Sequence, residues 1–156
     1  MNRAPGIGSI TAPTHETILR ARPTKPTRRK AKQQLPALAV GHVVLHVANV
    51  TAAAAFYQRL GLRPVWRRDD MAILELRGGT HLLLFRRATK RRSTRPAPFD
   101  LMADDLAAAH ANADAHGLAP SAIEHEQRSG HRSFSLRDPD GHRLTVYSSH
   151  TDGRPV

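Results

Sequence analysis

Polar side chains that could bind a ligand or a metal ion recur on one side of segments expected to be strands. The segment HVVLHV places His42 and His46 on the same side, because side chains alternate along a strand. The segment RLTVYS does the same for Arg143, Thr145 and Tyr147. Such a face either meets solvent or lines a cavity in which imidazole, guanidinium and phenol groups do chemistry.

Apolar periodicity and turn residues predict the elements that carry these side chains. Residues 42–50 are β-branched and apolar, as in a strand, and residues 49–61 form an amphipathic helix with Asn49 as N-cap and Gly61 as its stop. Further strands are expected at residues 63–68, 71–77 and 81–87. After a basic, proline-bearing segment the same order returns, with a strand at 99–103, a helix at 104–117, and strands at 121–127, 131–137 and 142–149.

The two halves are an internal repeat. When residues 42–64 are shifted by 56 positions, seven of the 23 residues meet identical ones, including the Gly-Leu-x-Pro that ends each helix. Two β-α-β-β-β modules are expected to pack as pseudo-twofold halves. We therefore predict an α+β fold, in which a mixed sheet curls around a cavity and the helices cover the outside.

Charge and composition set the domain limits. Residues 1–35 hold eight Lys and Arg and one acid, and contribute +7 of the formal net charge of +11. We expect a disordered basic leader at 1–36, a domain at 37–150 with modules at about 40–87 and 98–149, and a short tail at 151–156. The leader is either a solvated segment or a contact for nucleic acid.

Cysteine is absent, which excludes disulfides and thiolate metal sites and is compatible with a reducing cytoplasm, so we expect a cytoplasmic protein. No apolar run approaches a membrane span, and no membrane partner is expected.

The repeat, together with HVVLHVANVTAAAAFYQRLGL and LRDPDGHRLTVY, resembles the vicinal oxygen chelate (VOC) superfamily over about residues 40–150. This superfamily contains glyoxalase I, bleomycin-resistance proteins, fosfomycin-resistance thiol transferases and extradiol dioxygenases. The resemblance implies the paired-module fold, a small-molecule cavity and a homodimer. It also implies four cavity positions that hold a divalent metal in the enzymes, and of these only His42 matches. Leu83, Pro98 and Thr145 occupy the others, so the cofactor is either none or one divalent metal ion.

Because every second side chain of a strand points the same way, further residues are expected on the same inward face as His42. The predicted cavity lining is His42, His46, His81, Leu83, Phe85, Asp100, Arg143, Thr145 and Tyr147. A displaced metal site made by His42, His46 and Asp100, with His81, is one interpretation of this set. The other is that His46 and His81 lie at the rim and that Asp100 pairs with Arg143.

Two functions follow from this lining. The first is a metal-free protein that binds a small organic molecule, as a resistance factor that sequesters a drug does. Its ligand is expected to be anionic or polyphenolic rather than cationic, because the chain beyond residue 35 still carries a net charge of +4. The alternative is a lyase, thiol transferase or dioxygenase that depends on a divalent metal held by non-standard ligands. No catalytic residue is assigned.

Overall fold

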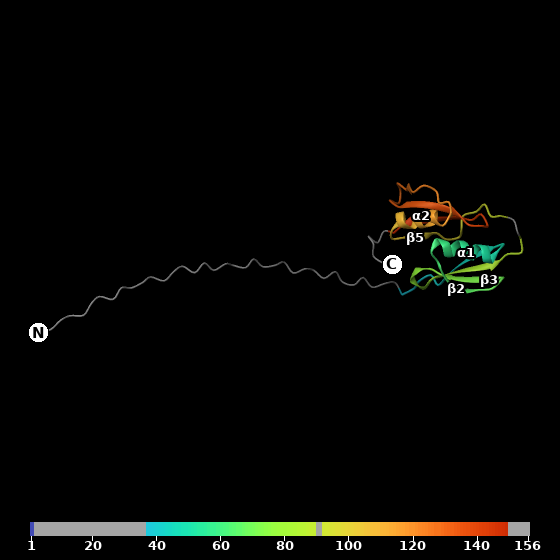
Figure 1. The fold of residues 1–156 in the computed structure, drawn as a ribbon, viewed down its shortest axis with the longest axis horizontal. Coiled ribbons are helices and arrows are strands. Elements are labelled where there is room, and N and C mark those ends of the chain that lie inside the picture. Colours follow the sequence, from blue (N-terminus) through green and yellow to red (C-terminus); the bar gives the residue numbers. More distant parts are fainter. Residues whose placement is uncertain (2–36, 90–91, 150–156) are drawn as a thin grey trace. The chain divides into compact units, whose positions relative to one another are not determined.

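Each half of the domain folds as a β-α-β-β-β module, as the repeat predicted (Figure 1). The computed structural model describes residues 1, 37–89 and 92–149, so the predicted leader beyond Met1 and the tail lie outside the described residues. Module 1 contains β1 (His42–Val47), α1 (Val50–Leu60), β2 (Arg63–Arg67), β3 (Met71–Glu75), a 3-10 turn (Arg77–Gly79) and β4 (His81–Arg86). Module 2 contains β5 (Leu101–Ala103), α2 (Leu106–Ala115), β6 (Glu124–His125), β7 (Arg132–Arg137) and β8 (Arg143–Ser148).

The modules form two separate four-stranded sheets with the same topology. Sheet 1 has the order β1-β4-β3-β2 and sheet 2 the order β5-β8-β7-β6. In each sheet the first and last strands of the module pair in parallel, and the other pairs are antiparallel. The predicted α+β class with two β-α-β-β-β modules is therefore confirmed.

Local capping sets the limits of both helices. Asn49 accepts a hydrogen bond from the backbone N–H of Ala52 at 3.0 Å, and α1 stops at Gly61, whose φ of 118° favours glycine. Asp105 caps α2 in the same way by accepting from the N–H of Ala108 at 2.9 Å. The caps of α1 are where the sequence predicted them, since they depend only on neighbouring residues.

One predicted strand is much shorter in the structure. The prediction was 121–127, whereas β6 spans only Glu124–His125. Ser121 interrupts the ladder, because its hydroxyl oxygen accepts the N–H of Ser135 at 3.0 Å. A positive φ of 49° at Ala119 bends the chain just before it.

The core lies between the helices and one face of each sheet. Leu45 and Val47 of β1 and Leu82 and Leu84 of β4 are buried on the face that α1 covers. In module 2 the corresponding face carries Phe134, Leu136, Leu144 and Val146. α1 also contacts α2, and buried residues of both modules form a single hydrophobic cluster. The modules thus pack through their helical sides, which leaves the opposite face of each sheet uncovered.

None of the helices within the described part of the chain is long and apolar enough to cross a membrane.

Candidate functional site

The candidate residues of module 1 share the face of sheet 1 that points away from α1. We call this the open face of sheet 1: His42, Val44 and His46 of β1, His81, Leu83 and Phe85 of β4, and Met71 and Ile73 of β3. The parallel register places His42 opposite His81, and their ring centroids are 5.7 Å apart. His46 instead lies opposite Phe85, at 6.0 Å.

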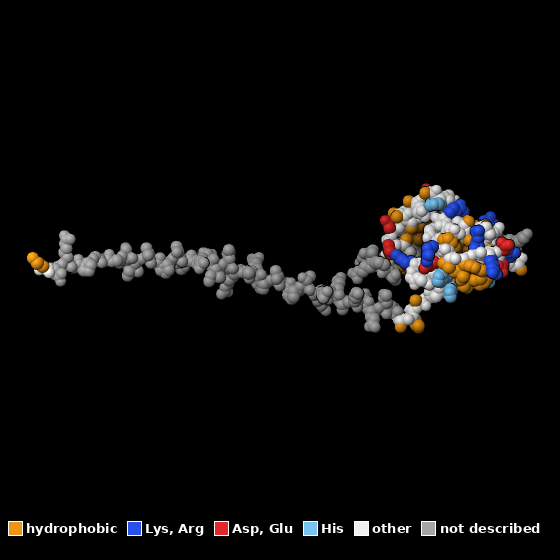
Figure 2. All heavy atoms as spheres, turned by 60° about the horizontal axis from the view of Figure 1, so that its bottom comes forward, with side chains coloured by type: hydrophobic (Ala, Val, Ile, Leu, Met, Phe, Trp, Pro, Cys, Tyr) orange, Lys and Arg blue, Asp and Glu red, His pale blue; other side chains and the backbone are white. Residues whose placement is uncertain are grey.

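The middle of this face is apolar. Val44 lies opposite Leu83, which in turn lies opposite Ile73, so that three branched side chains form a row across the sheet. Val44, in the middle of the edge strand β1, is 41% exposed. Figure 2 shows hydrophobic side chains gathered on this side of the molecule, with histidines beside them and Lys and Arg around them.

The candidate residues of module 2 lie on the matching face of sheet 2. We call this the open face of sheet 2: Met102, Arg143, Thr145 and Tyr147, with Ser133 and Ser135 of β7. Tyr147 lies opposite Met102 and Ser133, and Thr145 opposite Ser135. Asp100 is exposed just before β5, and the described residues contain no ion pair between it and Arg143.

The two open faces do not meet in either of the two pockets described among the placed residues. Its two best-formed pockets are lined by other residues, and none of the nine predicted lining residues is among them. The physical reason is the packing of the modules through their helices. That these nine residues line one cavity stays a prediction.

The donor set does not fit the divalent metal that the resemblance implies. Leu83 and Thr145 stand where carboxylates or imidazoles are needed, and a first-row cation takes about three or four protein ligands. Among the described residues no group of three His, Asp or Glu is arranged to hold a metal ion. Glu75, which lies opposite His81, is engaged in an ion pair with Arg63.

A buried polar cluster at the Asp-Pro-Asp-Gly turn joins the modules, and only the turn itself is visible in the sequence. Asp138 is 1% exposed and accepts hydrogen bonds from the backbone N–H and Nδ1 of His142, at 2.8 and 2.9 Å. The hydroxyl of Tyr57, in α1 of the other module, donates to the same carboxylate at 3.4 Å. Burial, and next the charge of Asp138, raise the pKa of Tyr57 far above its usual value, so the phenol stays protonated and remains a donor.

Asp140 makes a second link from the same turn. Its Oδ1 accepts the backbone N–H of Ala48, which follows β1, at 2.8 Å, and a guanidinium N–H of Arg87, which follows β4, at 2.6 Å. Both partners belong to module 1, so the turn before β8 holds the ends of the two paired strands of the other module.

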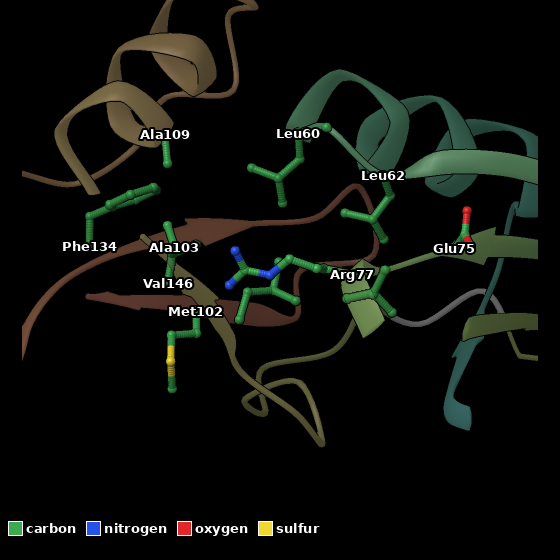
Figure 3. Close-up of a pocket in the computed structure, with 12 residues that line it drawn as sticks. Leu60, Leu62, Glu75, Arg77, Met102, Ala103, Ala109, Phe134 and Val146 are labelled. Carbon is green, nitrogen blue, oxygen red and sulfur yellow. The ribbon is translucent and has the colours of Figure 1, made fainter. Parts of the chain in front are cut away.

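A pocket of about 200 Å³ lies where the modules meet on their helical sides (Figure 3). We call it the inter-module cavity. It is lined by Leu60, Gly61, Leu62, Glu75, Leu76 and Arg77 of module 1 and by Leu101, Met102, Ala103, Ala109, Phe134 and Val146 of module 2. Arg77 forms an ion pair with Asp104 across the boundary, and the hydrogen bond from Arg77 lowers the pKa of the Asp104 carboxyl. The sequence does not indicate this cavity, because no local pattern shows which faces of two modules meet.

A family model matches most of the domain. The model of the Glyoxalase/Bleomycin resistance protein/Dioxygenase superfamily matches residues 39–146, from just before β1 to within β8. Among curated proteins, none matches the chain.

This chain matches solved structures with the same fold over nearly the whole length of those structures. Lactoylglutathione lyase from Agrobacterium tumefaciens is 22% identical, with a TM-score of 0.59 over 73% of this chain and 96% of its own. A glyoxalase/bleomycin resistance protein/dioxygenase from Alicyclobacillus acidocaldarius is 20% identical, with a TM-score of 0.60 over 73% and 93%. A bleomycin resistance determinant encoded on the transposon Tn5 is 26% identical, with a TM-score of 0.56 over 72% and 99%.

Proposed function

This chain belongs to the glyoxalase/bleomycin resistance protein/dioxygenase superfamily, and on that premise we propose that it is a homodimer that binds a small organic molecule without a metal. The ligand lies between the open face of sheet 1 in one protomer and the open face of sheet 2 in its partner. The nine residues predicted from the sequence then line a shared cup. The ligand is anionic or polyphenolic, and the protein sequesters it in the cytoplasm.

The observation that carries this proposal is the pair of uncovered, partly apolar sheet faces. Val44 is 41% exposed and Met102 is 50% exposed, each beside half-buried apolar or aromatic side chains. Sheets that are apolar on both faces normally pack against something on both. Because the helices already occupy the inner faces, a second copy of the chain is the partner that can cover both outer ones symmetrically.

The charge on the faces favours the ligand class. Arg143 and Arg137 lie opposite each other on sheet 2, and His42 and His81 lie side by side on sheet 1. These groups attract an anion or donate to phenol oxygens. The same charges disfavour a cationic glycopeptide such as bleomycin, which the description of the Tn5 determinant names.

Two valine variants test this proposal. Val44→Glu places a charge on the open face, whereas Val65→Glu places it on β2, where Val65 is 51% exposed and lines a groove toward α1. We expect the wild type and Val65→Glu to be dimers that bind a flavonol such as quercetin. Val44→Glu should be monomeric, and its affinity should fall at least about tenfold, because a carboxylate cannot be desolvated there without a partner.

Light scattering gives the mass and calorimetric titration gives the affinity. A wild type that stays monomeric at high micromolar concentration contradicts the shared cup. So does a Val44→Glu variant that dimerises and binds as Val65→Glu does.

The second candidate is a metal-dependent enzyme with non-standard ligands, and the adjacency of His42 and His81 favours it. Ring centroids 5.7 Å apart allow two imidazoles to approach one ion. Two nitrogens do not complete a site, so the remaining ligands have to come from outside the described residues or from a partner. The two histidines thus supply only part of the ligand set that a metal ion needs.

Elemental analysis of untagged protein separates the candidates. Under the primary proposal, we expect at most about 0.1 equivalent of metal after incubation with Fe²⁺, Mn²⁺, Ni²⁺ or Zn²⁺, because fewer than three ligands are present. Under the second candidate, a stoichiometric metal is lost in His42→Ala and in His81→Ala but retained in His46→Ala. His46 is the matched control, since it lies on the same strand and face but beside Phe85.

A further inference from the structure

The inter-module cavity is a second place where a small molecule fits, and of the residues that define the open faces it shares only Met102. It is on the helical side of sheet 2, where Phe134 and Val146 are buried, while the proposed cup uses the opposite side of that sheet. None of the nine predicted cup residues lines it.

The body of the cavity is apolar on both sides. Leu60 and Leu62 of module 1 face Phe134 and Val146 of module 2, with Ala109 of α2 above them (Figure 3). Its volume is about 200 Å³. An enclosed apolar cavity of about 150 Å³ is large enough to bind benzene. This pocket is partly open to solvent, and its volume accommodates a single aromatic ring or a short aliphatic chain.

One cation reaches into this apolar space. Figure 3 shows Arg77 extending from the 3-10 turn toward Met102 and Val146. Its guanidinium donates to Asp104, with one of the two hydrogen bonds at 3.2 Å, and its side chain is 45% exposed. A guanidinium has five N–H donors. Within the described residues only two of them are used, so donors remain for a second carboxylate.

We propose that the inter-module cavity binds a small organic monocarboxylate with an apolar body. The ring or chain lies among the leucines, Phe134 and Val146, and the carboxylate accepts hydrogen bonds from Arg77. Charge-assisted, fork-shaped donation of this kind is the usual way in which arginine recognises a carboxylate.

Two acidic residues of the site set the strength of binding. Asp104 competes for the same guanidinium, so its removal should favour the ligand. Glu75 also lines the cavity, but its carboxylate is paired with Arg63, which compensates its charge. Arg77 is the only cation among the described residues that line the cavity, so a ligand with one carboxylate matches it.

Titration of the isotope-labelled full chain with benzoate tests the proposal by NMR. We expect saturable shifts of the backbone amides of Arg77, Leu101 and Ala103. Neutral benzamide, which has nearly the same shape, should bind at least about tenfold more weakly because it lacks the charge that Arg77 recognises. Arg77→Gln should lose benzoate affinity to the same extent, while Arg59→Gln, an exposed arginine on α1, should leave it unchanged.

Further variants keep the test decisive if Arg77→Gln does not fold. Asp104→Asn should bind benzoate more tightly than the wild type. Ala109→Leu fills the cavity and should abolish the binding of both probes, whereas Ala107→Leu, exposed on the same helix, should not.

Equal binding of benzoate and benzamide, or unchanged binding in Ala109→Leu, overturns the proposal. So do shifts confined to the open faces. The Val44→Glu variant separates the two sites, since it should lose quercetin binding and keep benzoate binding.

Discussion

Replacing Asp140 with alanine should lower the free energy of unfolding by about 3 kcal/mol, near the lower end of the range for breaking a buried ion pair. The Asp140 side chain is 4% exposed and that of Arg87 is 18% exposed, so the pair is largely but not wholly removed from water. The variant leaves the Arg87 charge without its carboxylate. Nε of Arg87 is already buried without a partner among the described residues, so the guanidinium has no second acceptor there to replace Asp140. It also leaves the backbone N–H of Ala48 without its acceptor.

Equilibrium unfolding in urea measures the loss, and two further variants divide it. Asp140→Asn keeps an acceptor for Ala48 and removes only the charge, so it should cost less than Asp140→Ala. Arg87→Met removes the cation, and the double variant should be more stable than the sum of the two single losses predicts, because the pair acts as one unit. Asp70→Ala, an exposed carboxylate, should change the stability by less than about 0.5 kcal/mol.

A loss in Asp140→Ala as small as that in Asp70→Ala contradicts a structural role for the pair. A large loss confirms that the turn holds the two modules together. The inter-module cavity should then change as well, since its two walls belong to different modules.

Local signals in the sequence predicted the elements well. Asn49 and Gly61 limit α1 because a cap depends on residues three or four positions away, and the repeat showed that the second module has the same order. The alternation of side chains along a strand predicted which residues share a face, and it correctly separated His42, Val44 and His46 from Leu45 and Val47. Features that depend on residues close in the sequence were therefore predictable.

Contacts between the modules were not predictable in this way. Asp140 lies 92 residues from Ala48 and 53 residues from Arg87, and only the turn-forming property of Asp-Pro-Asp-Gly is visible in the sequence. The inter-module cavity likewise depends on which sides of the modules meet. Arg77 and Asp104 are ordinary surface charges until packing brings them together.

Gly141→Ala should destabilise the protein by about 3 kcal/mol, from two causes that add. Gly141 has a φ of 90°, and an L residue in that region costs about 1–2 kcal/mol. A Cβ there would also lie 2.5 Å from the carbonyl oxygen of Ser93. Backbone cannot swing aside as a side chain does, and overpacking of this kind costs about 1–3 kcal/mol.

Gly130→Ala is the matched control. Its φ of 72° carries a similar conformational cost, but a Cβ at Gly130 meets nothing within 4 Å. Urea unfolding should therefore show a loss of only about 1–2 kcal/mol for Gly130→Ala. The difference between the two variants measures the contact with Ser93 alone, and equal losses contradict it.

The contact matters for the candidate sites because the segment before β5 is held against this turn. Ser93 donates its backbone N–H to the carbonyl of Asp140 at 2.7 Å, and Ala97 donates to that of Arg143 at 2.8 Å. If an alanine at position 141 pushes Ser93 away, Leu101 should shift with the strand that it begins. Benzoate affinity should then fall in Gly141→Ala, at a temperature where the variant is still folded, and stay unchanged in Gly130→Ala.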